Sequence, residues 1–302
     1  MRSQPYLQRF IDFVTKNQLA VHHLRLLQGD DLIDSWDSKP VAPLDQRSIT
    51  KSVVALAFGC MREEYQLNTT DPVLDYFPDL AAAWLDSPWR DVTLEHLLTM
   101  SHGQPGKRLM ARFRAANDNK DWLPLCFEDE FISPPGRVFR YSNTGPYLLG
   151  IILSSLIQEP LEDYIQRHVL GPLGISKPAY LFDPKGRFFS GSGMQFTIDD
   201  LVKLARAIAR GSTASGAPWV PVDWLKQVTA PAIETGFNEP ERSHYGYYFW
   251  LARKNSWYMS GANSQIALYT PEKDLLFCCN GRVPDSARIN TAYWDLVFPA
   301  VP

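Results

Sequence analysis

Hydrophobic and polar residues near the start of the chain follow two different periods. Apolar residues in the segment 7–14 recur at helical spacing and predict an amphipathic helix, for which Ser3 is a candidate cap. In the segment 19–37, apolar and polar residues alternate on both sides of Gly29-Asp30. That alternation predicts two strands joined by a tight turn, which is a β-hairpin.

The middle and the end of the chain differ in the same way. Residues 48–211 show mostly helical periodicity, interrupted by loops rich in proline and glycine. Strand patterns then return, and a helix capped by Asp285 or Ser286 is expected to close the chain. These predicted elements are strands at 245–251, 264–270 and 274–280, a turn at 271–274 and a helix at 285–298.

This order of elements predicts an α+β fold in a single domain covering residues 1–302. Strands at both ends of the chain form one antiparallel sheet with flanking helices, and a mainly helical lobe is inserted between them. The sheet lobe is expected at about residues 1–47 and 240–302, and the helical lobe at about 48–239. Such a fold leaves a crevice between its lobes, where binding sites commonly lie.

Composition excludes several classes of protein. The net charge is −3, and the short basic segment 107–114 has no aromatic platform around it, so we expect no nucleic-acid partner. The longest apolar run, at 53–61, is too short for a membrane span, and the N-terminus has no apolar signal-peptide core. The four cysteines form no C-x-x-C pair and are interpreted as buried free thiols. A cytoplasmic protein without metal or other cofactor is expected.

Ser48 and Lys51 form the only S-x-x-K sequence of the chain. Side chains at positions i and i+3 share one face of a helix, and the apolar run that follows would bury Lys51. Burial lowers the pKa of a lysine, so that its amine can accept the proton of a serine nucleophile. The alternative is an ordinary helix capped by Ser48, since S-x-x-K alone is a weak motif.

A second candidate element is Tyr141-Ser142-Asn143, the only Tyr-x-Asn of the chain. A tyrosine beside a lysine can relay a proton to a leaving group. Asn143 can hydrogen-bond a substrate carbonyl and hold Lys51 in place. The alternative is a loop tyrosine that simply precedes the next helix.

Together these motifs resemble the serine β-lactamase and penicillin-binding-protein superfamily, in particular its class C β-lactamase-like branch of esterases and amide hydrolases. The resemblance covers nearly the whole chain, from the Ser48 helix to the closing strands. It implies a β-lactamase/transpeptidase-like fold, with Ser48 as nucleophile, Lys51 as its base partner and Tyr141 as second proton carrier.

The chain departs from this family at its third motif, Lys-Thr-Gly or His-x-Gly. The matching residues are Met259-Ser260-Gly261, and the single His-x-Gly, at His244, comes a strand too early. Ser260 and Gly261 keep a hydroxyl and a close backbone approach at a substrate-binding position. The resemblance implies that the N–H groups of Ser48 and Ala262 form an oxyanion hole. The missing lysine disfavours substrates with a carboxylate.

Two further residues are candidates for substrate binding. Asn263, with Ser264, replaces a more glycine-rich turn and is expected to narrow or polarise the mouth of the site. Arg288, at the start of the last helix, is a candidate partner for a substrate carboxylate in place of the missing lysine. A surface arginine is the alternative for Arg288.

The sequence therefore predicts a serine hydrolase that forms an acyl-enzyme with a small ester or amide. One alternative is a catalytically weak or inactive binding scaffold of the same fold. Another is a β-lactamase or a D-Ala-D-Ala-type peptidase. The sequence leaves open the acyl and leaving groups, the oligomeric state and whether Lys51 or Tyr141 is the main base.

Overall fold

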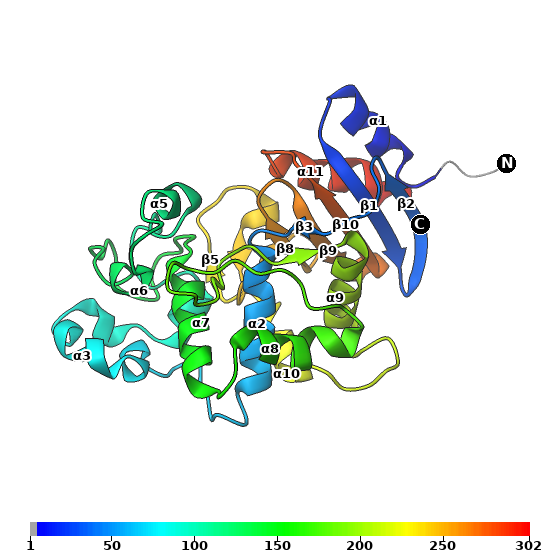
Figure 1. The fold of residues 1–302 in the computed structure, drawn as a ribbon. Coiled ribbons are helices and arrows are strands. Elements are labelled where there is room, and N and C mark those ends of the chain that lie inside the picture. The colour runs from blue at the N-terminus through cyan, green and yellow to red at the C-terminus, as the bar shows by residue number, and fades with distance from the viewer. Residues whose placement is uncertain (1–4) are drawn as a thin grey trace.

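The computed structural model describes residues 5–302 and contains a large sheet with helices on both faces and a helical lobe beside it (Figure 1). Within the described residues this sheet has eight strands in the order β2-β1-β10-β9-β8-β7-β6-β5, and all neighbouring pairs are antiparallel. The strands are β1 (Val21–Gln28), β2 (Asp31–Asp37), β5 (Ile233–Glu234), β6 (His244–Tyr245), β7 (Trp250–Ala252), β8 (Ser256–Gly261), β9 (Gln265–Thr270) and β10 (Leu275–Gly281). The predicted α+β class, with a sheet drawn from both ends of the chain, is confirmed.

Most helices lie between the two groups of strands in the sequence. Strand β3 (Leu44–Asp45), just before α2, pairs with β4 (Gln195–Phe196), just before α9, in a separate two-stranded ladder. The helices are α1 (Gln8–Lys16), α2 (Ile49–Met61), α3 (Pro78–Trp84), α4 (Leu94–Leu98), α5 (Ala111–Ala115), α6 (Trp122–Leu125), α7 (Thr144–Leu156), α8 (Leu161–Ile165), α9 (Ile198–Arg210), α10 (Val222–Val228) and α11 (Ala287–Ala292).

The two faces of the sheet pack against different helices. On one face, Leu24 and Phe277 form a core with side chains of α1 and of the C-terminal segment around α11. On the other face, Cys278 joins the larger core that contains α2 and α9. Cys279 belongs to the first core, so the adjacent cysteines point to opposite faces, as strand alternation predicts.

The N-terminal predictions are confirmed where the structure describes them. Helix α1 buries Phe10 and Val14, and β1 and β2 form the hairpin around Gly29. Gly29 has a φ of 62°, a left-handed conformation that glycine adopts without strain. The candidate cap Ser3 lies outside the described residues.

The predicted strand at 245–251 is wrong as a single element. The chain folds back inside it, so that β6 and β7 pair with each other and Tyr245 lies opposite Trp250. A Cβ atom on Gly246 would stand 2.2 Å from the carbonyl oxygen of Val228, and Tyr248 has a φ of 64°. Close packing at this glycine and the left-handed residue together produce the turn, which apolar spacing alone does not encode.

The boundaries between the two lobes stay a prediction. Strand β5 pairs with β6 although it precedes residue 240, and α9 packs on β1, β9 and β10 although it lies within the range expected for the helical lobe. In the part of the chain that the structure describes, no helix combines the length and the apolar character needed to cross a bilayer.

Candidate active site

Helix α2 runs through the centre of the molecule, between the sheet and the helical lobe (Figure 1). All its residues from Ile49 to Gly59 are buried, as expected for a helix that is apolar on all sides. Ser48 occupies its N-cap position, yet among the described contacts the serine hydroxyl makes no capping hydrogen bond. The capped-helix alternative therefore lacks the interaction that defines it.

The Lys51 side chain is 1% exposed, and its Nζ lies at the junction of three chain segments. Nζ lies 3.0 Å from Ser48 Oγ, and it donates to Asn143 Oδ1 at 2.7 Å and to the Gly191 carbonyl oxygen at 2.5 Å. A helix turn supplies the first partner, and two distant segments supply the others. This arrangement holds the amine against the serine hydroxyl.

Burial shifts Lys51 toward its neutral form. Removal from water disfavours the ammonium form and lowers the lysine pKa well below its ordinary value, and the nearby Arg114 guanidinium lowers it further. Arg114 is itself held by the Leu109 carbonyl at 2.7 Å. A buried amine beside a serine hydroxyl is a chemically competent proton acceptor.

Tyr141 and Asn143 immediately precede α7, and both side chains lie against Lys51 Nζ. Lys51 Nζ lies 5.1 Å from the centroid of the Tyr141 ring. Burial raises the pKa of Tyr141 to about 12, and a hydrogen bond with the Ser48 hydroxyl opposes that shift. The Tyr141 hydroxyl therefore keeps its proton near neutral pH and acts as a donor. Asn143 is fixed by its Nδ2, which donates to the Leu109 carbonyl at 2.9 Å.

Strand β8 approaches the serine from the sheet. A Cβ atom on Gly261 would stand 2.2 Å from the Gln46 carbonyl oxygen and 3.0 Å from Arg47 Cβ, so a larger residue would push the strand away from the start of α2. Arg47 itself turns the chain with a φ of 53°. Gly261 therefore allows the C-terminal end of β8 to lie against the residues that precede Ser48.

Ser48 opens into a cavity of about 290 Å³ between α11, strands β7 and β8 and the segment before β6. Tyr141 stacks on Trp250 with ring centroids 5.8 Å apart, and Trp250 stacks on Tyr258 at 6.3 Å. These three rings form an aromatic wall of the cavity. The other lining residues are Met110, Glu239, Glu241, Arg242, Ser260, Gly261, Ala262, Ser286, Ala287, Asn290 and Thr291.

The structure does not bring Asn263 and Arg288 into this cavity. Arg288 donates to Asn17 at 2.9 Å and lies over the Phe13 ring, because its position on α11 directs it toward α1. The expectation that Ser264 narrows the mouth is wrong: its side chain is buried and donates to the Val283 carbonyl at 3.1 Å.

The other candidate for the family's third motif is the His-x-Gly at His244. It lies on β6, which β7 separates from β8, and it is not part of the cavity lining. Met259, at the family's lysine position, is fully buried in the larger core. The wall of the site formed by β8 therefore carries a hydroxyl at Ser260 and no cation among its described residues.

Several residues around the site were not singled out from the sequence. The Gly191 carbonyl is a backbone group, and no residue type signals its role. Arg242 and Glu239 form an ion pair at 2.6 Å on the cavity rim. Their clustering in the Pro-containing segment before β6 was a signal available in the sequence. Within residues 5–302, no group of three or more His, Cys, Asp and Glu side chains is arranged to hold a metal ion.

Comparison with known proteins gives similar folds over nearly the whole chain. The structure of an octameric penicillin-binding protein homologue from Pyrococcus abyssi superposes with a TM-score of 0.74 at 21% identity, covering 97% of this chain and 77% of that one. The structure of EstCE1, a hydrolase with promiscuous acyltransferase activity, has a TM-score of 0.76 at 15% identity and covers 98% of both chains. At these identities the likeness establishes the fold.

The matches to curated relatives cover a smaller share of each relative. The 6-aminohexanoate-dimer hydrolase of Paenarthrobacter ureafaciens is 21% identical over 219 residues, which are 68% of this chain and 56% of that protein. This chain thus spans about half the length of that relative, and less of the next ones. The Beta-lactamase family model matches residues 43–294. This match covers most of the chain, including Ser48, Lys51 and Tyr141. The protein therefore belongs to the β-lactamase family, within the hydrolase superfamily of β-lactamases and penicillin-binding-protein-like proteins.

Proposed function

We propose that the protein is a serine hydrolase that forms an acyl-enzyme at Ser48 with a small ester or amide. The observation that carries this proposal is the contact of the buried Lys51 Nζ with Ser48 Oγ at 3.0 Å. A serine hydroxyl is a weak nucleophile until a base takes its proton, and a buried amine of lowered pKa supplies that base.

The proton path follows from the protonation states. Ser48 Oγ attacks the substrate carbonyl carbon, and its proton passes to Lys51 Nζ. The N–H groups of Ser48 and Ala262 stabilise the oxyanion of the tetrahedral intermediate; each such donor contributes about 10²–10³ in rate. Tyr141 keeps its proton at neutral pH and donates it to the leaving group, and Lys51 reprotonates Tyr141. Water then attacks the acyl carbon and gives its proton to Lys51 Nζ; the bond between Ser48 Oγ and the acyl carbon breaks, the acid leaves, and Lys51 returns the proton to Oγ.

The charges around the cavity favour substrates without a free carboxylate at the reacting end. Met259 supplies no cation, and the one described cation of the cavity lining, Arg242, already pairs with Glu239. Glu241, a further carboxylate of the lining, pairs with Arg253. The aromatic wall accommodates an apolar acyl or leaving group. A hydrolase that works by acyl transfer agrees with the names of two relatives, a 6-aminohexanoate-dimer hydrolase and a hydrolase with promiscuous acyltransferase activity.

The test is the intact mass of the protein after brief exposure to a fluorophosphonate and, separately, to a penicillin. Attack of Ser48 Oγ on phosphorus displaces fluoride and leaves a phosphonyl adduct. We expect one adduct on the wild type and none on Ser48→Ala. Ser52→Ala is the matched control, because Ser52 lies on the next turn of α2 and donates to the Tyr248 carbonyl. This control should be labelled like the wild type.

Each outcome separates the alternatives. A wild-type protein that reacts with neither reagent would favour the binding scaffold over the hydrolase. Penicillin acylation of Ser48 would mean that the site accepts a carboxylate in spite of Met259, and it would favour the β-lactamase or peptidase alternative. Hydrolysis of active esters with the same dependence on Ser48 would support the esterase or amidase.

A further inference from the structure

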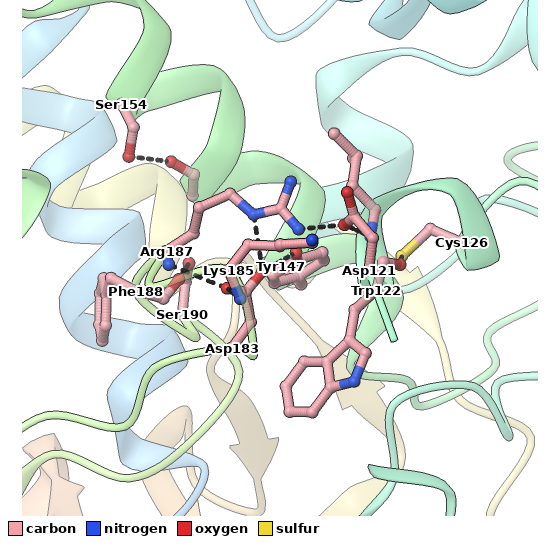
Figure 2. A network of polar contacts seen from close by, with 12 residues as sticks. Asp121, Trp122, Cys126, Tyr147, Ser154, Asp183, Lys185, Arg187, Phe188 and Ser190 are labelled. Carbon is pink, nitrogen blue, oxygen red and sulfur yellow. Dashed lines mark hydrogen bonds and ion pairs between the residues drawn. The ribbon is translucent and has the colours of Figure 1, made fainter. Parts of the chain in front are cut away.

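A second polar network, outside the lining of the cavity, joins Asp121, Tyr147, Asp183 and Arg187 (Figure 2). Its centre is Asp183, whose carboxylate is fully buried. Asp183 Oδ2 accepts from the Tyr147 hydroxyl at 2.6 Å and from Arg187 Nε at 2.6 Å. Arg187 also pairs with Asp121, the N-cap residue of α6. The network therefore joins α6, α7 and the loop between Leu181 and Met194.

Asp183 also organises its own loop. Its Oδ1 accepts from the backbone N–H of Lys185 at 2.8 Å and from that of Arg187 at 2.9 Å. The Asp183 backbone N–H donates to the Arg187 carbonyl at 2.8 Å. Residues 183–187 are thus a closed turn fixed by one carboxylate. From this turn the chain leads through the fully buried Phe189, whose ring contacts Tyr147, to Gly191.

The network connects the two acceptors that hold Lys51 from outside its own helix. Asn143 lies one helical turn before Tyr147, and the Tyr147 N–H donates to the Asn143 carbonyl at 3.1 Å. Gly191, the other acceptor, follows the turn that Asp183 closes. The hydrogen bond from Tyr147 to Asp183 therefore links two segments that contact Lys51. One segment carries Asn143 Oδ1, and the other is the loop that carries the Gly191 carbonyl.

We propose that Asp183 and Tyr147 are positioning residues for the reaction at Ser48: their hydrogen bond sets the separation of Asn143 and Gly191 and so holds Lys51 against the serine. The inference rests on the function proposed above. Shared burial keeps the bond short and excludes water from it. Misplacement of a catalytic group by about 1 Å can cost about 100-fold in rate. Loss of the hydrogen bond between Tyr147 and Asp183 should therefore lower kcat.

The test is Tyr147→Phe, which removes the bridging hydroxyl and keeps the ring in its aromatic contacts. We expect kcat for an active ester to fall about 10- to 100-fold with KM changed by less than about twofold. Tyr293→Phe is the matched control: Tyr293 is equally buried, and its hydroxyl bonds Thr270 in the other core at 2.7 Å. The control should lose a similar amount of thermal stability and keep the wild-type kcat.

A double-mutant cycle separates positioning from general stability. If Tyr147 acts through Lys51, Tyr147→Phe should cause no further loss in labelling rate in a Lys51→Ala background. Asp183→Asn is the second variant, because its amide would face the Tyr147 and Arg187 donors; it should lower kcat in the same way.

A wild-type kcat in Tyr147→Phe would overturn the proposal, and so would an equal loss of labelling rate with and without Lys51. In either case, labelling of wild-type Ser48 would still support the hydrolase function. A wild type that is never labelled at Ser48 would overturn both.

Discussion

Replacing Asn143 with aspartate should move the pH dependence of the reaction in a defined direction. Asn143 Oδ1 lies 2.7 Å from Lys51 Nζ, so the substitution places a carboxylate in direct contact with the amine. An opposite charge at such a distance raises the pKa of a lysine by about 1–3 units. In the wild type, burial lowers that pKa, and the proposed mechanism uses the neutral amine to take the Ser48 proton.

In Asn143→Asp the carboxylate stabilises the ammonium form, so the neutral amine appears only at higher pH. The acidic limb of the kcat/KM profile should therefore shift upward by about 1–3 pH units. At a pH below both limbs, activity should fall about 10- to 1000-fold, because each unit corresponds to a factor of ten in the neutral fraction. Much of the loss should be recovered above the shifted limb.

The assay is kcat/KM for an activated ester from about pH 5 to pH 10, with Ser48→Ala as the blank for spontaneous hydrolysis. Asn68→Asp is the matched control: Asn68 is exposed, and its Nδ2 likewise donates to a backbone carbonyl, that of Gln66. A limb that stays in place or moves to lower pH in Asn143→Asp would refute a neutral Lys51 as the proton acceptor. An equal loss at every pH would instead indicate that the substitution only distorts the site.

Three further predictions concern packing, specificity and thiol chemistry. Gly59→Ala should destabilise the protein by about 2 kcal/mol and lower Tm by a few degrees in calorimetry, because the new Cβ would stand 1.9 Å from the Trp224 ring and overpacking outweighs the gain in helix propensity; an unchanged or higher Tm would contradict this packing. Arg288→Ala should change kcat/KM for an anionic ester by less than about twofold, since Arg288 bonds Asn17 outside the cavity, and a marked rise in KM would restore it as a substrate-binding residue. At about pH 8 an aromatic disulfide reagent should react with no thiol of the native protein and with all four after unfolding. The reason is that burial raises the pKa of Cys60 to about 12 and also raises the pKa values of the other three cysteines. Rapid release of one thiolate equivalent from the native protein would argue against this burial. The other three are Cys126, Cys278 and Cys279.

The sequence predicted the parts of the fold that depend on local spacing. The hairpin at Gly29, the helix that begins after Ser48 and the turn at Pro271 follow from alternation, helical periodicity and turn residues. The strand at 245–251 could not be divided in this way. Its aromatic residues satisfy a strand pattern throughout, and the chain turns back through the close packing of Gly246 on the Val228 carbonyl and the left-handed Tyr248.

Arg288 and Arg242 illustrate the limit for candidate site residues. Both are arginines on short helical segments near the cavity, and the family resemblance pointed to Arg288. The phase of α11 directs Arg288 toward Phe13, whereas Arg242 lies on the rim beside Glu239. Residue type carries no information about which side of a helix end faces a cavity, so this choice required the packed structure.

By itself, the sequence determined that Ser48 and Lys51 are neighbours, because residues three apart on a helix always share a face. The buried state of Lys51 also followed, since an apolar run directly behind it must enter the core. The sequence also offered Asn143 as a residue that holds Lys51, but only the tertiary structure shows that contact and adds the Gly191 carbonyl as a second acceptor. Asn143 and Gly191 lie 92 and 140 residues from Lys51 along the chain. Contacts over such separations depend on how distant loops close and pack, and one of the two acceptors is a backbone carbonyl that any residue could provide.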